Sequence, residues 1–337
     1  PPFSGLIDDE FIWGRGSLDI KGMMFAELEA AELLLAQGMP LQSTLILAFG
    51  DDEETTSEGA TVLASVLEER GIRDAFLLDE GTTSHADGAT FGADGVQIQG
   101  MCLSQKGFLT IRLHAHGRGG HASNPFGGTS LEKLADAVRC VRAAMPAPKI
   151  TPLLANALDE LGVEQSGDLL EHLLTSRDGF PYVADTMAVT QVLGSAPSAN
   201  VLPVDATVTI NFRLLPGTDL EGFIALIESS LPEGIGLEGV HATPAARADT
   251  TDGPVYEALL SAFERYYGGV RFVPLFMCGG CDAIRYEAVT AQSVRILPFL
   301  APPELESRIH GIDERMPKRA YLQSIRVLVR FLQDVLL

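Results

Sequence analysis

Along the first part of the chain, segments with the apolar spacing of helices alternate with short apolar runs. Residues 22–37 are rich in Ala, Leu and Glu and predict a helix. Residues 43–49 form an apolar run that predicts a buried strand. A second helix over 57–70, ended by Gly71, and a second strand over 75–78 follow. This alternation predicts the α/β class, with a mostly parallel sheet flanked by helices.

The pattern changes near residue 105. Residues 108–116 alternate between apolar and polar side chains, as a half-buried strand does. A helix is predicted over 130–144, and a section rich in Pro, Gly and Asp comes after it. Two strands and one helix complete this part, at 186–193, 206–214 and 220–231. This mixture predicts a smaller α+β sandwich that is inserted into the first domain.

The α/β pattern returns from about residue 245. Its predicted elements are helices at 254–266 and 318–335 and strands at 271–276 and 292–297. We therefore expect two domains. Residues 1–104 and 245–337 would form the α/β domain, and residues 105–244 would form the insertion.

Composition and charge favour a folded protein whose partners are not nucleic acids. Hydrophobic residues make up 46% of the 337 residues, which is enough for a sizeable core. The formal net charge of −21 argues against binding to nucleic acid or to an anionic membrane. No apolar run reaches the roughly 20 residues of a membrane span. No signal peptide is recognisable, and we expect a cytoplasmic protein.

Four cysteines are too few for a disulfide scaffold in a chain of this length. Cys278 and Cys281 have the CxxC spacing found in zinc and redox sites. The two glycines between them are more typical of a tight turn. The CxxC spacing alone is therefore weak evidence for chemistry.

Acidic residues follow the apolar runs, where the carboxyl ends of parallel strands are expected. Four carboxylates, Asp51 to Glu54, follow the segment 43–49, and Asp79 and Glu80 follow 75–78. Ligands of such sheets bind beyond these strand ends. One acid can bind a metal while its neighbour accepts a proton. Like charges this close raise one another's pKa unless a cation compensates them. The alternative is a solvated acidic loop.

Two further candidates lie far apart in the sequence. Asp19 lies in a glycine-containing run that precedes a predicted helix, and it could instead cap that helix. His310 lies near the end of the chain in the run HGIDE. In their order along the chain, these residues suggest one site that is assembled by the fold.

The combined motifs resemble the zinc-dependent exopeptidases and amidohydrolases. This family includes aminoacylase, carboxypeptidase S, glutamate carboxypeptidase and the acetylornithine and succinyl-diaminopimelate deacylases. The PPFSG and LDEG runs are most similar to the carboxypeptidase S and aminoacylase branch. The motifs that carry the resemblance span nearly the whole chain: PFSG, GRGSLDIKG, DDEE, LDEG, GGHASNP, NVLP, NFRLLPG, GGCD and HGIDE.

The resemblance implies a site for two Zn²⁺ ions per subunit. Asp19 would bridge the ions, and Glu54 and His310 would complete the first site. The second ion would take a carboxylate from Glu80, which matches the Glu-Pro-Thr of relatives, although Asp79 remains an alternative. Such a pair of ions can activate one water and polarise the scissile carbonyl.

The resemblance also implies the catalytic residues. Glu53 would be the general base, which takes the proton of the water and delivers it to the leaving amine. His121 lies in the inserted domain, and in the family this histidine reaches the active site of a neighbouring subunit and stabilises the oxyanion. The inserted domain would then act as a lid and would form a homodimer through residues 105–244. A core or surface histidine is the alternative for His121.

Four residues resemble the family's substrate-binding positions. Asn200 would contact the carbonyl group, and Arg213 could hold a free α-carboxylate with its two-pronged guanidinium; it could also be an ordinary strand arginine. Gly280 and Asp282 match a loop at the substrate end, and Asp282 could instead cap the following helix. The remaining histidines fall in no motif and are expected to be structural or solvent-facing: His85, His114, His116, His172 and His241.

One family motif has no counterpart. The family carries a further histidine ligand in a His-x-Asp motif upstream of the PPFSG run, but the first histidine of this sequence is His85. Either an upstream segment supplies this ligand or the site is incomplete. With the residues of this chain alone, the second zinc would bind weakly or not at all.

Three functions follow as expectations. The first is a zinc-dependent carboxypeptidase or N-acyl-amino-acid hydrolase, which cleaves the amide bond next to a C-terminal amino acid. A biosynthetic deacylase, acting on acetylornithine or succinyl-diaminopimelate, would have the same site and a different pocket. A non-catalytic relative that serves as a binding or dimer scaffold is the third. Zinc analysis and a panel of N-acyl amino acids and dipeptides would separate them.

Overall fold

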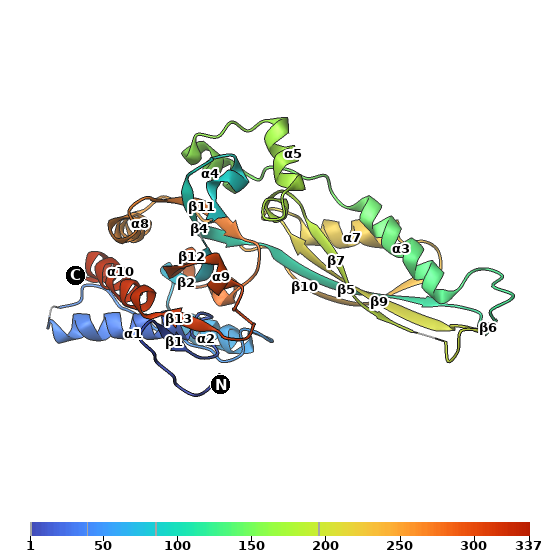
Figure 1. Cartoon of the computed structure of the whole chain (residues 1–337), viewed down its shortest axis with the longest axis horizontal. Coiled ribbons are helices and arrows are strands. Elements are labelled where there is room, and N and C mark those ends of the chain that lie inside the picture. The colour runs from blue at the N-terminus through green and yellow to red at the C-terminus, as the bar shows by residue number, and fades with distance from the viewer. Residues whose placement is uncertain (1, 39, 85, 195) are drawn as a thin grey trace.

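A five-stranded sheet forms the centre of the larger part of the molecule (Figure 1). The computed structural model describes residues 2–38, 40–84, 86–194 and 196–337. In this sheet the strand order is β11–β4–β12–β2, and β3 pairs with β4. The pairs β11–β4 and β12–β2 are parallel, whereas β12 meets β4 antiparallel. The strands are β2 (Ala75–Ser84), β3 (Ala86–Asp87), β4 (Gln97–Gln105), β11 (Val270–Met277) and β12 (Thr290–Ala301).

Long helices pack against this sheet. They are α1 (Lys21–Ala36), α2 (Glu58–Glu69), α8 (Pro254–Tyr266) and α10 (Lys318–Leu336). In α10, the buried side chains Val327, Leu328, Phe331 and Leu332 recur at helical spacing and join the main core. The mixed α/β class predicted from the sequence is confirmed. Among the described residues, no helix combines the length and the apolar character that crossing a bilayer requires.

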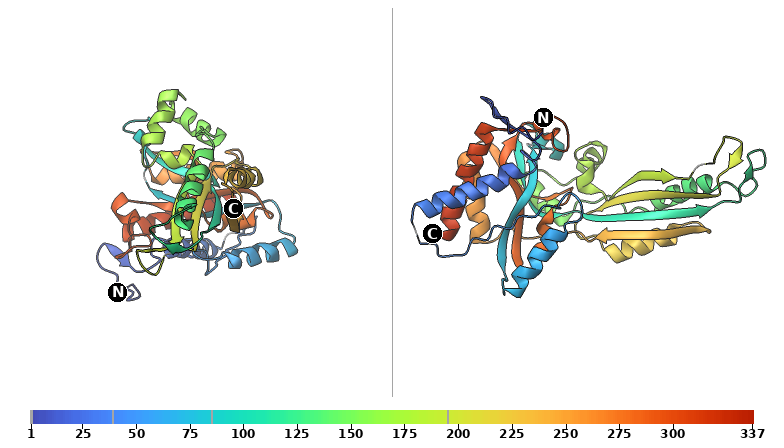
Figure 2. Two further views of the ribbon diagram at one scale, coloured as in Figure 1. Left: turned by 90° about the vertical axis from the view of Figure 1, so that its right-hand side faces the viewer. Right: turned by 90° about the horizontal axis from the view of Figure 1, so that it is seen from below.

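A second sheet extends from the larger part as an arm (Figure 2, right). Its antiparallel order is β10–β5–β9–β7, formed by β5 (Gly107–His116), β7 (Thr186–Leu193), β9 (Asp205–Leu214) and β10 (Ile235–Thr243). Helices α3 (Ser130–Ala144) and α7 (Leu220–Ser230) bury their apolar side chains with those of β5 and β9. Two short strands, β6 (Gly120–His121) and β8 (Val201–Leu202), pair at the far end of the arm.

The chain returns to the larger part in the middle of the predicted insertion. Helices α4 (Pro152–Leu161), α5 (Gly167–Thr175) and α6 (Phe180–Val183) lie between α3 and β7 in sequence. Their buried residues, such as Leu154 and Leu173, belong to the core of the larger part. The domain division at 104/105 and 244/245 stays a prediction. At the junction, Gly107 lies so close to the returning chain that a Cβ would be 2.7 Å from the backbone nitrogen of Ala245.

The predicted buried strand over 43–49 is wrong. This segment pairs with no described strand, and Ile46, Leu47 and Phe49 are exposed. An apolar run becomes a strand only where a neighbouring strand offers partners for its N–H and C=O groups. Composition does not show whether such an edge is available. The acidic run that follows this segment nevertheless reaches the position described below.

The other predicted helices and strands are present, with shifts of a few residues at some ends. His85 lies outside the described residues. The remaining short elements are β1 (Phe11–Trp13), β13 (Arg315–Pro317), α9 (Pro303–Glu306) and the 3-10 helices η1 (Gly88–Phe91) and η2 (Asp282–Tyr286).

Candidate active site

A buried carboxylate joins the loop of Asp19 to the loop of His310. Strands β1 and β13 pair antiparallel and bring the two loops together. Glu314, which is 5% exposed, accepts hydrogen bonds from the N–H groups of Gly16 (3.0 Å), Leu18 (2.9 Å) and Asp19 (3.2 Å). The position of Asp19 therefore depends on a residue almost 300 positions later in the chain.

Three side chains from distant parts of the sequence meet at this place. The Nε2 atom of His310 lies 2.7 Å from Oε1 of Glu54 and 3.0 Å from Oδ2 of Asp19. One potential ligand atom from each of the three residues lies within 4.8 Å of the others, as metal binding requires. The hydrogen bond with Glu54 raises the pKa of His310. The cluster is open on one side, because the side chains of Glu54 and His310 are exposed.

A bulge in β2 places Glu80 beside Asp19. On β12, Arg295 and Ile296 are neighbours, but their partners on β2 are Asp79 and Thr82, so Glu80 and Gly81 have no counterpart. Such a bulge changes the direction of a side chain. A Cβ on Gly81 would lie 2.3 Å from the carbonyl group of Arg295, so only glycine fits there.

The carboxyl group of Glu80 contacts that of Asp19. Burial, together with the charges of Asp79, Glu53 and Asp19, raises the pKa of Glu80 to about 10. In the absence of a cation, the protonated Glu80 therefore donates a hydrogen bond to Asp19. This contact makes Glu80 the better placed of the two candidates in the Asp79–Glu80 pair.

Asp79 belongs instead to a buried polar network. Its Oδ1 accepts a hydrogen bond from the N–H of Glu80 (2.8 Å), and its buried Oδ2 has no hydrogen-bond partner among the described residues. The thiol of Cys281 donates a hydrogen bond to Oε1 of Gln105 (3.3 Å). Arg295 is 1% exposed, contributes positive charge, and donates from Nε to Oε1 of Gln105 (2.9 Å). The network places a cation behind the acidic cluster.

Glu53 and Asp282 form the inner side of the site. Burial and the charges of Asp282, Glu54 and Asp19 raise the pKa of Glu53 to about 7. Asp282 begins η2, and burial raises the pKa of its carboxyl group. Among the described contacts, its side chain caps no backbone N–H of the following helix. The structure therefore brings Asp282 to the side of Glu53.

Asp52 has a different place from its neighbours in the acidic run. Its carboxylate accepts hydrogen bonds from the hydroxyl of Thr56 (2.8 Å) and the N–H groups of Glu58 (2.7 Å) and Gly59 (3.0 Å). These bonds, first that of Thr56, lower its pKa. Asp52 thus satisfies the free N–H groups at the start of α2. The loop is thereby held so that the next two acids reach the cluster.

The residues of the cluster fit a divalent metal ion. Imidazole nitrogen and carboxylate oxygen are donors that zinc accepts in proteins. Burial first, and then the charges of neighbouring carboxylates, raise the pKa values of Asp19, Glu53 and Glu80. A bound cation would oppose both effects. The residues concerned are Asp19, Glu53, Glu54, Glu80 and His310.

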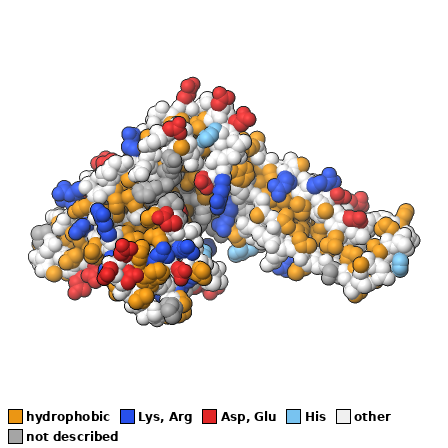
Figure 3. Space-filling view, viewed as in Figure 1, with side chains coloured by type: hydrophobic (Ala, Val, Ile, Leu, Met, Phe, Trp, Pro, Cys, Tyr) orange, Lys and Arg blue, Asp and Glu red, His pale blue; other side chains and the backbone are white. Residues whose placement is uncertain are grey.

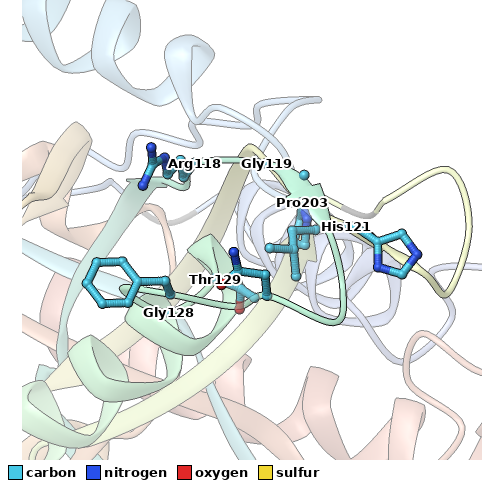
Figure 4. A pocket seen from close by; sticks show the side chains of 10 residues that line it. Arg118, Gly119, His121, Gly128, Thr129 and Pro203 are labelled. Atoms are coloured by element: carbon cyan, nitrogen blue, oxygen red, sulfur yellow. The ribbon is translucent and has the colours of Figure 1, made fainter.

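His121 and Asn200 lie together at the far end of the arm. The N–H of Ala122 donates to the carbonyl oxygen of Asn200 (2.8 Å). The Nδ1 of His121 is 2.8 Å from the hydroxyl of Ser123. Beside them is a cavity of about 340 Å³. Figure 4 shows the ring of His121 directed away from Pro203, which also lines the cavity. Figure 1 places this end of the arm far from the acidic cluster, so neither residue joins that cluster within one chain.

Arg213 and Gly280 lie near the junction of the arm and the larger part. The guanidinium of Arg213 stacks 5.0 Å from the ring centre of Phe108, at the start of β5. Burial lowers the pKa of Arg213. Gly280 is exposed, and a Cβ there would lie 3.2 Å from Nε2 of Gln105.

Sequence reasoning missed two acids. Glu314 was part of the HGIDE motif, but a motif does not show that a side chain binds backbone N–H groups of another loop. Glu27 lies on α1 between the buried Met23 and Ala30, and burial together with the charge of Asp79 raises its pKa to about 8. An acid within the apolar stripe of a helix was the available signal.

Known proteins are similar to this chain along nearly its whole length. A probable carboxypeptidase S-like protein 2 of Dictyostelium discoideum is 30% identical over 96% of this chain and 66% of that protein. Human N-fatty-acyl-amino acid synthase/hydrolase PM20D1 is 28% identical over 99% of this chain and 70% of its own length. The chain thus spans about two thirds of the length of these curated relatives.

Solved structures share the fold. The M20 family metallo-carboxypeptidase Sso-CP2 from Sulfolobus solfataricus has a TM-score of 0.71 at 19% identity, over 99% of this chain and 80% of that one. Human carnosine dipeptidase 1 has a TM-score of 0.64 at 14% identity, over 99% and 76%. The model of Peptidase family M20/M25/M40 matches residues 1–334. This chain belongs to that peptidase family.

Proposed function

We propose that the protein is a zinc-dependent hydrolase that cleaves the amide bond next to a C-terminal amino acid. The observation that carries this proposal is the meeting of Asp19, Glu54 and His310, whose ligand atoms lie within 4.8 Å of one another. The family and its relatives support metal-dependent amide hydrolysis. The partly buried Glu53 beside the cluster adds a group that can exchange protons.

The proposed ligands divide into two groups. Asp19, Glu54 and His310 would hold one Zn²⁺, and Glu80 with Asp19 would contribute to a second. Bound zinc polarises a carbonyl group and makes a water molecule more acidic. Glu314 would keep Asp19 in place, and Arg295 would balance the charge of Asp79.

Glu53 would move the proton. A carboxyl group whose pKa is near 7 can both accept and release a proton at neutral pH. Glu53 would take a proton from the water that attacks the amide carbonyl and deliver it to the departing nitrogen. Asp282, close by, favours the protonated form of Glu53 and so helps it to accept the proton.

Arg213 and the arm would select the substrate. Arg213 offers a two-pronged contact to the α-carboxylate of the C-terminal amino acid, and Gly280 leaves room beside Gln105. His121 and Asn200 lie too far along the arm to act in their own chain, so we assign them to the site of a second subunit. Residues 105–244 would form this dimer.

Two classes of substrate are candidates. The relatives named N-fatty-acyl-amino acid synthase/hydrolase favour an N-acyl amino acid, and those named carboxypeptidase favour a peptide. Steady-state rates with matched substrates, an N-acyl-phenylalanine and an acyl-Ala-Phe dipeptide, would distinguish them. The cytoplasmic location expected from the sequence also stays a proposal.

Replacing Glu53 by Gln tests the mechanism. The full-length Glu53→Gln variant should lose roughly 10²- to 10⁴-fold in kcat, because the amide side chain cannot accept the proton. Its zinc content, measured by elemental analysis, should stay that of the wild type. Glu58→Gln, an exposed change at the start of α2, is the control and should keep full activity. Turnover retained in Glu53→Gln would refute the assignment.

A further inference from the structure

We propose that the arm carries a second, separate site for a divalent cation of the zinc type, formed by His114, His116 and Asp205. The three residues lie on two neighbouring strands of the arm sheet, β5 and β9. They belong to none of the motifs that point to the catalytic cluster. The sequence alone gave these histidines no role.

The two histidines share one face of β5. Residues at i and i+2 of a strand point to the same side, and the intervening Ala115 is fully buried in the arm core. Asp205 is the register partner of His116 on β9. Its Oδ1 lies 2.9 Å from Nδ1 of His116 and 3.2 Å from Nε2 of His114. One ring nitrogen of each histidine is therefore directed to the same carboxylate oxygen.

A bulge in β10 adds a fourth side chain. The register between β10 and β5 shifts between Leu237 and Gly239, which leaves Glu238 without a partner on β5. Oε1 of Glu238 lies 3.6 Å from Nδ1 of His114. Histidines that bind a metal through one nitrogen commonly direct the other N–H to a carboxylate. Glu238 is in the position to orient His114 in this way.

The chemistry suits Zn²⁺. Two imidazole nitrogens and one carboxylate oxygen make a three-ligand set, to which water adds a fourth ligand. Zinc–nitrogen distances are about 2.0–2.1 Å. Both ring nitrogens now lie at hydrogen-bond distance from one oxygen of Asp205, and the three groups are not yet close enough together to share an ion, so the exposed side chains would have to reorient around it. Hydrogen bonding, first from His116, lowers the pKa of Asp205 and keeps its carboxylate ionised. His114 is 30% exposed and the other two are more open, so an ion can reach them.

A cation here would join β5 to β9 near the end of the arm. His116 is the last residue of β5, and the chain continues from it to β6, which contains His121. Binding would therefore restrict the part of the arm that presents His121. The proposed site shares no residue with the cluster of Asp19, Glu54 and His310.

The test isolates the arm site from the catalytic site. An Asp19→Asn/Glu54→Gln/His310→Asn background removes the proposed bridging ligand and two further proposed catalytic ligands from the full-length protein. After treatment with a chelator, this protein is titrated with Zn²⁺ in competition with a chromogenic chelator, and its thermal unfolding is followed with and without Zn²⁺. We expect one zinc bound per chain and a rise in Tm. Adding His116→Gln should abolish both effects, and adding Glu238→Gln should weaken zinc affinity about 10- to 100-fold.

The matched control is His241→Gln in the same background. His241 is an exposed histidine on β10 that makes an edge-to-face contact with Phe108 and lies outside the proposed site. This variant should keep both the bound zinc and the rise in Tm. The metal-free Tm of each variant shows whether the fold is intact. Zinc binding that survives His116→Gln, or an absence of binding in the background protein, would overturn the proposal. Neither result bears on the proposed hydrolase function, which is tested separately by activity of the unmodified enzyme.

Discussion

At the scale of single residues, Glu314 holds the loop that contains Asp19. Its carboxylate accepts three backbone hydrogen bonds and an ion pair from Arg15 (2.6 Å). Glu314→Ala should lower the free energy of unfolding by on the order of 3 kcal/mol, because buried N–H groups lose their acceptor. Zinc affinity should fall as well, since Asp19 is no longer held. Denaturant unfolding and zinc titration would measure the two effects.

Two further variants make this result specific. Glu314→Gln keeps one oxygen as an acceptor and should cost less than Glu314→Ala. Asp313→Asn changes the exposed neighbouring acid, which has a positive φ of 59° that Asn tolerates. It should leave both stability and zinc affinity unchanged. Equal losses in Asp313→Asn and Glu314→Ala would mean that the whole loop, rather than the Glu314 carboxylate, is responsible.

Glu27 predicts how stability depends on pH in the metal-free protein. Burial and the charge of Asp79 raise its pKa from 4.5 to about 8, so the fold favours the protonated form. This contribution is fully present below pH 4.5 and is lost as the pH rises through 8. The loss is on the order of 3–5 kcal/mol, from about 1.4 kcal/mol for each tenfold change in proton affinity.

Glu27→Gln should remove this dependence. The variant should be more stable than the wild type at pH 8 and of similar stability at pH 4.5, measured by denaturant unfolding of chelator-treated protein. Glu29→Gln, an exposed change on the same helix, should keep the wild-type profile. A wild-type profile in Glu27→Gln would show that other acids carry the dependence.

Motifs in the sequence identified several residues of the candidate site, and the structure was needed to identify the others. The acids Asp19, Glu53 and Glu54 and the distant His310 were selected from motifs, and the structure brings them together. The choice between Asp79 and Glu80 needed the bulge in β2, which depends on pairing with β12. Pairing between distant strands leaves no local signal in the sequence. For the same reason the backbone contacts of Glu314 could not be foreseen.

At the scale of elements, the bulge in β2 depends on Gly81. A Cβ at this position would meet the carbonyl group of Arg295 at 2.3 Å, so the strands would have to separate. Gly81→Ala should lower the free energy of unfolding by at least about 3 kcal/mol and should weaken zinc binding through Glu80. Gly167→Ala is the control, because nothing lies within 4 Å of its Cβ position. Thermal unfolding and zinc titration of both variants would check this.

Prediction of elements succeeded where local pattern decides the structure. Helices such as α3 and α8 agree with the predicted ranges, because apolar spacing and start signals such as Thr129 before α3 are local. The segment 43–49 failed because a strand also needs a neighbour. Helices α4 to α6 were missed in a section rich in Pro and Gly, and they are stabilised by packing on a core that lies mostly outside the predicted insertion.

At the scale of the whole molecule, the arm presents an apolar surface and an open sheet edge. Strand β7 pairs with β9 on one side and with no described strand on the other. Val192 and Leu193 are 59% and 60% exposed. A groove of about 330 Å³ runs between α3 and β7, lined by Leu131, Leu134, Ala135, Val138, Val189, Val192 and Val208. Figure 3 shows hydrophobic side chains along the arm. Such an edge without charged residues favours pairing with another strand.

This surface predicts how a dimer can be broken. A twofold axis would pair two copies of β7 antiparallel and bring the two α3 grooves together. Val192→Lys places a charge on the edge, which should block this pairing. The variant should have a monomeric mass in light scattering, where the wild type is expected to be a dimer. The control is Arg112→Lys on β5, which leaves the β7 edge unchanged and should keep the dimer. Thr190→Lys would not serve, because Thr190 lies on the same edge as Val192.

The proposed exchange of His121 between subunits gives the decisive experiment at this scale. The variants His121→Ala and Glu53→Gln should each be inactive alone, because every site in their dimers lacks one group. Mixed subunits form dimers in which one site receives His121 from the Glu53→Gln chain and contains its own Glu53. After random exchange of equal amounts, the mixture should regain roughly a quarter of the wild-type activity. Adding Val192→Lys to both chains should abolish this recovery. If His121 acted within its own chain, one subunit of each mixed dimer would lack His121 and the other Glu53, so no activity would return on mixing.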